Sequence, residues 1–484
     1  MKASSERATR AWVLALASVA SFMVALDALV VSTALSTIRH DLGASIETLE
    51  WTVNAYTLSF AVLLMTGAAL GDRFGRRRMF VGGLGLFAAA SAACALAPTA
   101  NWLIAARAIQ GAGAALVTPL AMALLIAAFP PEARGKALGI FSGLTGLAVL
   151  SGPVVGGAIS QGIAWQWIFW LNVPIGLLAI PFVLSRIQES FGLRTALDIP
   201  GLALVTGATL GVVWGLVRGN TAGWGSLEVV TALAAGILLA VAFVAWERRA
   251  REPMLPMRFF RSRAFSLGNA ANFLTFASLF GALFFMAQFL QTAQGYGPLA
   301  TGLRLLPWTG TVFIVAPIAG ALVNRVGERT LMVGGLSLQA IGMGWIALIA
   351  TPNLAYAALV APLIVAGCGI SMSIPATQNA VMNSVARNEI GKASGTFNML
   401  RQLGGAFGVA ILVAVFARGG SYASAQAFSD GFARALGVSA AMSLMGAVAC
   451  LGLPGRREVT ETIPLLVAPV EAAWGSSGEI ERSA

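Results

Sequence analysis

The chain alternates between long apolar runs and short polar segments along most of its length. A membrane-spanning helix needs about 20 predominantly apolar residues. Runs of that length occur at 12–35, 50–70, 79–98, 102–127, 136–160, 166–185, 197–217, 228–246, 264–290, 302–323, 330–350, 354–376, 392–416 and 434–453. This pattern predicts an all-α, polytopic membrane protein with 14 transmembrane helices.

Composition supports the membrane assignment. The chain is 57% hydrophobic and 11% charged, whereas a soluble domain carries about 25% charged residues. The net charge of +11 would suggest a nucleic-acid partner in a soluble protein. Here the basic residues fall between apolar runs, so we expect the lipid bilayer, and no nucleic acid, as the partner.

Lysines and arginines concentrate in alternate loops. On one side are Lys2, Arg7, Arg10, Arg73, Arg76, Arg77, Arg78, Arg134, Lys136, Arg186, Arg194, the six arginines within 248–263, Arg325, Arg329, Arg387, Lys392, Arg456, Arg457 and Arg482. The intervening loops carry only Arg39, Arg218, Arg418 and Arg434. Because basic loops stay in the cytoplasm, this distribution predicts that both termini are cytoplasmic.

A sequence repeat divides the chain into two halves. The segment Gly-Lys-Ala-Leu-Gly-Ile-Phe at 135–141 recurs as Gly-Lys-Ala-Ser-Gly-Thr-Phe at 391–397. This spacing predicts six-helix bundles at 12–185 and 264–453, related by a pseudo-two-fold axis. Two linker helices at 197–246 are inserted between them, and 454–484 forms a cytoplasmic tail. Parallel halves of this kind place a substrate site between them, near the middle of the membrane.

The loop between the second and third spans carries a specific motif. Residues 67–78 read Gly-Ala-Ala-Leu-Gly-Asp-Arg-Phe-Gly-Arg-Arg-Arg. Four arginines alone would indicate an ordinary basic loop, and glycine permits a sharp turn. The pattern Asp-Arg-x-Gly-Arg-Arg after a membrane helix resembles the corresponding loop of the major facilitator superfamily of secondary transporters. We expect Asp72, Arg73, Gly75 and Arg76 to form an inner gate, with Asp72 at the start of the 392–416 helix.

Further motifs resemble the fourteen-helix drug:proton antiporter branch of that superfamily. They are Leu26-Asp27, Trp51 to Tyr56, Arg107-Ala-Ile-Gln110-Gly111, Gly152-Pro153-Val-Val-Gly156-Gly157, Trp165 to Pro174, and Arg401-Gln402-Leu-Gly404-Gly405. The resemblance implies a monomeric, cofactor-free antiporter in the bacterial inner membrane. It would export small molecules such as drugs, dyes or antibiotics in exchange for protons, by alternating access.

Asp27 is the only acidic residue placed deep inside a predicted span, and such residues usually have a function. Arg107 is its expected partner, because at about 1.5 Å per residue both lie roughly 10 Å below the outer surface. Burial favours the neutral acid and a nearby arginine favours the carboxylate. We therefore expect this pair to couple transport to protons, the alternative being a purely structural ion pair.

The other candidate residues concern packing and the substrate cavity. Gly152, Pro153, Gly156 and Gly157 predict a bent, closely packed helix between the halves, or generic helix packing. The predicted cavity residues are Asn54, Tyr56, Gln110, Phe280, Phe284, Gln288, Asn398, Arg401 and Gln402. For the phenylalanines a lipid-facing or packing stripe is the alternative. For Asn398, Arg401 and Gln402 it is a satisfied network between helices.

Three functions compete on these residues. The first is proton-driven export of amphipathic molecules, expected to be cationic, and it is motivated by Asp27 and the 152–157 motif. The second is export of one endogenous metabolite, antibiotic or lipid by the same fold. The third, a membrane-embedded enzyme, is disfavoured because His40 is the only histidine. Cys94, Cys368 and Cys450 lie in apolar runs, so we expect neither a metal site nor a disulfide.

Overall fold

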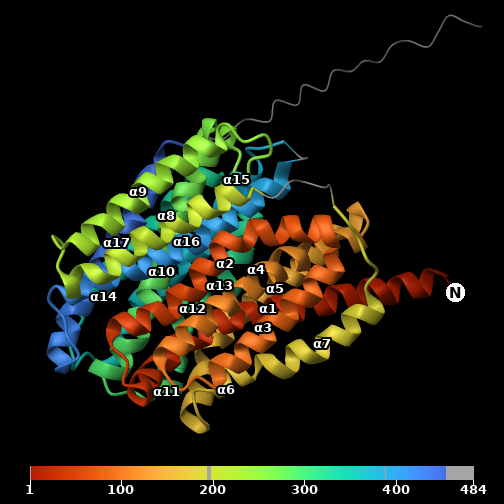
Figure 1. The fold of residues 1–484 in the computed structure, drawn as a ribbon. Coiled ribbons are helices and arrows are strands. Elements are labelled where there is room, and N and C mark those ends of the chain that lie inside the picture. Colours follow the sequence, from red (N-terminus) through yellow and green to blue (C-terminus); the bar gives the residue numbers. More distant parts are fainter. Residues whose placement is uncertain (1, 193–197, 387–388, 454–484) are drawn as a thin grey trace, which may run out of the picture.

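The computed structural model describes residues 2–192, 198–386 and 389–453 (Figure 1). The predicted tail at 454–484, together with Arg194 and Arg387, lies outside the described residues. The described chain is helical and contains 14 helical spans long and apolar enough to cross a membrane. The predicted fold class is therefore confirmed: the chain is a multi-pass, all-α membrane protein.

Along the sequence, a pair of inserted helices separates two six-span bundles. The N-terminal bundle comprises α1 (Lys2–Leu42), α2 (Ile46–Phe74), α3 (Arg76–Ala95), α4 (Ala100–Ala128), α5 (Pro131–Gly162), α6 (Trp167–Trp170) and α7 (Asn172–Arg186). The inserted helices are α8 (Ile199–Ala222) and α9 (Leu227–Glu247). The C-terminal bundle comprises η1 (Met257–Arg261), α10 (Arg263–Gln288), η2 (Phe289–Ala293), α11 (Pro298–Arg304), α12 (Leu306–Thr309), α13 (Thr311–Val326), α14 (Glu328–Ile349), α15 (Tyr356–Met382), α16 (Ile390–Ala417) and α17 (Ala425–Leu451).

Two predicted spans are interrupted. The 166–185 span is divided into α6 and α7, and the 302–323 span belongs to three successive helices, α11 to α13. Pro307 has no N–H to donate to the carbonyl of Leu303, so a continuous α-helix loses a hydrogen bond there. The first helix is longer than predicted, because α1 continues to Leu42. Arg39 and His40, predicted in a loop, lie in its last turn.

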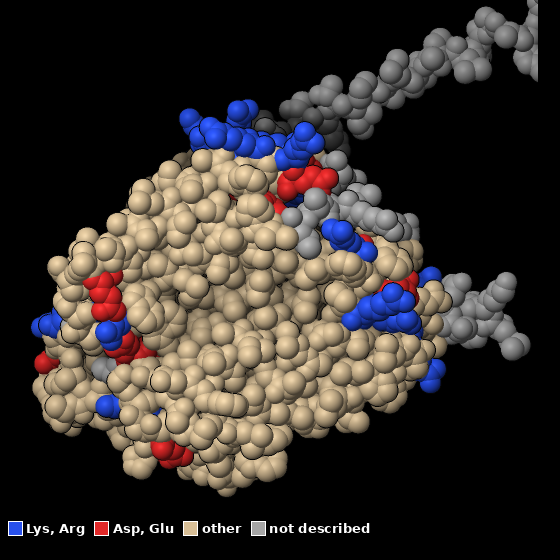
Figure 2. Space-filling model, viewed as in Figure 1, with Lys and Arg blue, Asp and Glu red and all other residues tan. Residues whose placement is uncertain are grey.

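The two ends of the bundle differ in charge. We call the end that carries Arg73, Arg76, Arg77 and Arg78 the arginine-rich end, and the other the opposite end. Charged side chains gather at the ends of the molecule and leave a broad uncharged belt between them (Figure 2). Such a belt suits the hydrocarbon core of a bilayer, where each unpaired charge is costly.

The inserted helices lie along the seam between α2 and α16. Val205 and Val213 of α8 belong to the same apolar cluster as Val62 of α2 and Leu403 of α16. At the opposite end, Arg218 of α8 forms an ion pair of 3.2 Å with Glu47 of α2. Helix α8 therefore covers a seam between the bundles, and α9 packs against α8.

Candidate functional site

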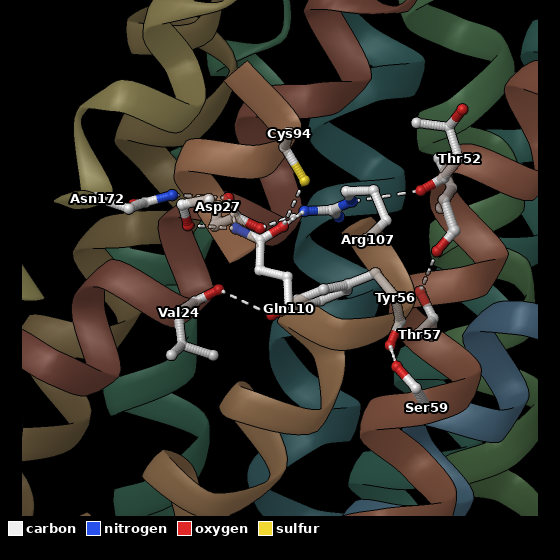
Figure 3. Close-up of polar contacts among 12 residues, drawn as sticks. Val24, Asp27, Thr52, Tyr56, Thr57, Ser59, Cys94, Arg107, Gln110 and Asn172 are labelled. Atoms are coloured by element: carbon white, nitrogen blue, oxygen red, sulfur yellow. Dashed lines mark hydrogen bonds and ion pairs between the residues drawn. The ribbon is translucent and has the colours of Figure 1, made fainter. Parts of the chain in front are cut away.

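A buried polar network surrounds Asp27 (Figure 3). Arg107 on α4 donates from Nη1 to Oδ2 of Asp27 at 2.5 Å. Gln110 on α4 and Asn172 on α7 each donate to Oδ1 at 2.8 Å. The Asp27 side chain is 0% exposed and that of Arg107 is 1% exposed. A buried ion pair is tolerated when further hydrogen bonds satisfy its atoms, and here three donors serve one carboxylate.

Arg107 is held from several sides. Its Nε donates to the carbonyl oxygen of Thr52 at 3.3 Å, and its Nη1 also reaches Oε1 of Gln110 at 2.6 Å. The guanidinium carbon lies 4.1 Å from the centre of the Tyr56 ring. The Tyr56 hydroxyl donates in turn to the carbonyl of Val24 on α1. Any change at Asp27 therefore affects contacts that involve α1, α2, α4 and α7 together.

A cavity of about 890 Å³ lies between the bundles. Val24, Ala25, Ala28 and Leu29 of α1 line it, whereas Asp27 does not. At the arginine-rich end its lining includes Asp72, Arg76, Asp198, Glu252 and Lys392, which lie at helix ends or in loops. The polar network therefore lies beside the cavity, separated from it by the wall that α1 provides.

At the opposite end the two bundles are joined. Gln291 of η2 donates to the carbonyl of Thr33 on α1 at 3.0 Å and accepts a hydrogen bond from Ser36. Arg39 of α1 lies 3.7 Å from the ring centre of Tyr422, and the Tyr422 hydroxyl donates to Gln288. The cavity is thus closed at the opposite end in this conformation.

The 152–157 segment of α5 is part of that closure. A Cβ atom at Gly157 would lie 2.2 Å from the carbonyl oxygen of Pro298, and one at Gly302 would lie 2.3 Å from that of Pro153. Only glycine allows α5 and α11 to approach so closely. Gly152 and Gly156 face α1 instead. Pro153 and Gly157 therefore lie where α5 meets α11 of the other bundle, whereas Gly152 and Gly156 pack within the N-terminal bundle.

The chain matches a family model described as Major Facilitator Superfamily over residues 17–409. The tetracenomycin C resistance and export protein of Streptomyces glaucescens is 35% identical over 407 residues, which cover 83% of this chain and 75% of that protein. The cephamycin export protein CmcT of Amycolatopsis lactamdurans is 35% identical over 432 residues, which cover 87% of this chain and 88% of that protein. The chain belongs to the major facilitator superfamily.

Other relatives agree with this family. The multidrug resistance protein Stp of Mycobacterium tuberculosis is 34% identical over 398 residues, which cover 82% of this chain and 74% of that protein. Among solved structures, a peptide transporter POT in complex with sulfate has a TM-score of 0.67 at 15% identity and covers 91% of this chain and 93% of that one. A D-xylose-proton symporter has a TM-score of 0.66 at 16% identity and covers 92% and 98%. These two structures establish the fold alone.

The motif loop of this superfamily member is bound to its own bundle. Asp72 forms an ion pair with Arg76 at 2.8 Å, and Gly75 has a φ of 107°. The backbone N–H groups of Arg77 and Arg78 donate to Glu189, at 2.8 and 3.2 Å. Among the described residues, no hydrogen bond or ion pair joins Asp72 to α16, although both line the cavity mouth. The contact between Asp72 and α16 stays a prediction.

The predicted cavity residues separate into two groups. Phe280, Asn398, Arg401 and Gln402 line the cavity. The other five, Asn54, Tyr56, Gln110, Phe284 and Gln288, are outside its lining in this conformation. Tyr56 and Gln110 belong to the Asp27 network, and Gln288 accepts a hydrogen bond from Tyr422. Asn54 and Phe284 contact residues of their own helices, Glu50 and Phe285.

The sequence patterns do not single out three residues that the structure brings into the site. Asn172 lies within the 165–174 motif, which does not show that it reaches Asp27, and Glu189 belongs to no motif. Glu50 is 0% exposed, so Asp27 is not the only buried acid. The sequence places Glu50 at the edge of the 50–70 span, and because α2 begins at Ile46 this residue lies inside the helix. The signal available was the spacing of Glu50 and Asn54, four residues apart on one helical face.

Proposed function

We propose that this chain is a proton-coupled antiporter that exports amphipathic organic molecules by alternating access. The observation that carries the proposal is the fully buried pair of Asp27 and Arg107 beside the wall of a cavity between two bundles. Relatives named as export and resistance proteins support the export of drug-like molecules. One chain supplies both bundles and the cavity, so a monomer suffices.

The charge distribution supports an orientation. Because basic loops are retained in the cytoplasm, the arginine-rich end is proposed to face the cytoplasm of a bacterium, with the protein in its inner membrane. Both termini then lie in the cytoplasm. The cavity, which opens at that end and is closed at the other, corresponds to an inward-facing state.

Proton coupling follows from the chemistry of the pair. Protonating Asp27 removes the negative charge that Arg107 faces, and a buried arginine without a counter-ion is strongly unfavourable. Arg107 must then find other partners. Because it also binds α2 and Gln110, its movement would displace several helices. Carrying a proton inward yields about 2.3 kcal/mol per 100 mV of membrane potential.

The cycle uses the two closures in turn. In the inward-facing state the substrate enters from the cytoplasm while Asp27 is ionised. The contacts of α5 with α11 and of Gln291 with Thr33 then separate, and the arginine-rich end closes. Substrate leaves to the outside, a proton binds Asp27, and the protein returns. A specific exporter of one endogenous compound would use the same cycle, and the breadth of substrates separates the two functions.

Drug susceptibility tests the proposal. A pump-deficient bacterium that expresses the wild type should tolerate several structurally unrelated amphipathic compounds better than cells with empty vector. Asp27→Asn should abolish the protection at equal membrane abundance, and so should a protonophore. Protection that persists in Asp27→Asn or with the protonophore would contradict proton-driven export. Protection against a single compound would favour the specific exporter.

A further inference from the structure

Arg401 is the one charge deep in the cavity lining. Six charged residues of the described chain line the cavity: Asp72, Arg76, Asp198, Glu252, Lys392 and Arg401. The first five lie at the termini of helices or in loops at the arginine-rich end. Arg401 lies nine residues further along α16 than Lys392, which is about 13 Å at the helical rise. The inner part of the cavity therefore carries a positive charge alone.

No side chain of the described protein neutralises Arg401. No hydrogen bond or ion pair joins it to another described residue, and its one recorded aromatic neighbour is the ring of Phe276, 5.4 Å from the guanidinium carbon. Arg107, by contrast, is paired with Asp27. A lone arginine at membrane depth is costly, and a guanidinium binds carboxylates strongly through two parallel hydrogen bonds. A bound anion would supply the missing partner.

The residues around Arg401 indicate the chemical character of the rest of that ligand. Phe276 and Phe280 lie with ring centres 6.1 Å apart and both line the cavity. The part of the lining that α1 supplies is mainly apolar, with Val24 and Leu29 among its residues. These surfaces suit a flat or bulky apolar body. A volume of about 890 Å³ falls in the range of sites for drug-sized molecules.

Polar groups beside Arg401 remain open to the cavity. Gln402 lines the cavity and makes no recorded hydrogen bond with another described residue, and Asn398 donates only to the carbonyl of Ser394. Nearer the mouth, Lys392 lies on the same helix. At the mouth the charges are of both signs, and deeper in an entering acid meets a guanidinium flanked by amides.

We propose that the cavity selects amphipathic organic anions, whose carboxylate or phenolate pairs with Arg401 while an aromatic or aliphatic body packs against Phe276 and Phe280. This inference rests on the proposed export function and narrows its substrate class. It replaces the expectation of cationic substrates, and Asp27 is not placed to receive a cation. That carboxylate is saturated by three donors and does not line the cavity, whereas a substrate cation would meet an unneutralised arginine.

Matched probes of different charge test the selectivity. Naphthoate, naphthamide and naphthylmethylammonium share one aromatic body and are titrated calorimetrically into the purified full-length protein in nanodiscs. The wild type should bind the anion at least about tenfold more tightly than the cation. Arg401→Gln should weaken anion binding roughly 10- to 100-fold and leave the neutral amide unchanged, while Arg401→Lys should retain much of the preference.

Arg304→Gln is the matched control. Arg304 is another arginine of the C-terminal bundle, but it stacks on Tyr296 at 3.7 Å and does not line the cavity. Its replacement should leave the preference for the anion intact. Equal affinities for anion and cation in the wild type, or an anion affinity that survives Arg401→Gln, would overturn the proposal.

Transport in proteoliposomes separates this inference from the export function. The protein could bind the anion in a way that needs Arg401 and yet transport none of the probes. That result would contradict the proposed export function and uphold the selectivity for anions. Export of the ammonium probe that is independent of Arg401 would uphold export and contradict the selectivity. Folding of each variant is checked by size-exclusion chromatography before either measurement.

Discussion

Oδ2 of Asp27 on α1 lies 2.5 Å from Nη1 of Arg107 on α4, and both side chains are buried. Gln110 and Asn172 complete the shell of the carboxylate. Because α1 also supplies one wall of the cavity, the pair can respond to the shape of the cavity without touching the substrate. This separation allows a proton and a substrate to occupy the protein at different positions.

Arg107→Ala should severely impair transport, and Arg107→Lys should not restore it fully. A lysine is a point charge and cannot reproduce the fork that binds Asp27, Gln110 and the Thr52 carbonyl together. Removing one partner of a buried pair also destabilises the fold, by about 3–5 kcal/mol. Substrate efflux and thermal unfolding of the purified variants measure the two effects.

Arg304→Lys serves as the control for the arginine-to-lysine change, since Arg304 donates to the carbonyl of Ala300 and has no carboxylate partner among the described residues. It should transport at close to the wild-type rate. Wild-type transport by Arg107→Lys would show that the geometry of the guanidinium is not needed.

Gly157→Val should weaken the closure at the opposite end. Its side chain would meet the carbonyl oxygen of Pro298 at a distance, 2.2 Å for Cβ, that backbone atoms cannot absorb without moving α5 away from α11. Such overpacking typically costs about 1–3 kcal/mol. Spin labels at positions 40 and 423, both exposed at the opposite end, should report longer distances than in the wild type.

The same substitution at Gly162 is a control within α5. A Cβ there meets no atom within 4 Å, so Gly162→Val should leave both the distances and transport unchanged. Equal distances in Gly157→Val and the wild type would mean that the contact between α5 and α11 does not hold the opposite end closed.

Asp72→Asn should slow turnover and shift the population towards the inward-open state, with substrate binding largely kept. The start of α16 carries a partial positive charge, and a carboxylate near a helix N-terminus gains roughly 0.3–2 kcal/mol. In the present conformation Asp72 is paired with Arg76 and lines the cavity mouth. Labels at the exposed positions 73 and 391 should approach each other when the cavity closes at this end.

Glu189→Gln provides the comparison for that gate, because Glu189 binds the motif loop to its own bundle rather than to α16. It should loosen the loop without changing how often the two labels approach. A distance between 73 and 391 that stays long in every condition, or that is unaffected by Asp72→Asn, would contradict the gating role.

Much of the fold was predictable because a membrane imposes simple rules. Apolar length located the spans, and loop charge gave a consistent alternation. The pairing of Asp27 with Arg107 could be inferred from depth alone, since two buried charges of opposite sign at one level seek each other. The break around Leu305 could not be predicted, because proline in a membrane helix either bends or interrupts it, depending on its neighbours.

The contacts of individual polar side chains were harder to foresee. Asn54 and Asn172 are both single asparagines in apolar spans, yet only Asn172 reaches Asp27, while Asn54 binds Glu50. Spacing tells which residues share a helical face, but not towards which neighbouring helix the face is turned. The sequence predicted that Arg401 lines the cavity. Because spacing does not identify the neighbours of a side chain, only the structure shows that Arg401 lacks a counter-ion.

Proton flux through Asp27→Asn is the decisive measurement of whether Asp27 carries the proton. Wild type and variant are reconstituted into liposomes that enclose a pH-sensitive dye, and a transported substrate is added on one side under an imposed pH gradient. Binding of the same substrate to the variant and its elution profile confirm that it is folded. The proposed proton coupling predicts substrate-dependent proton movement in the wild type and none in Asp27→Asn. Equal proton movement in both proteins would contradict it.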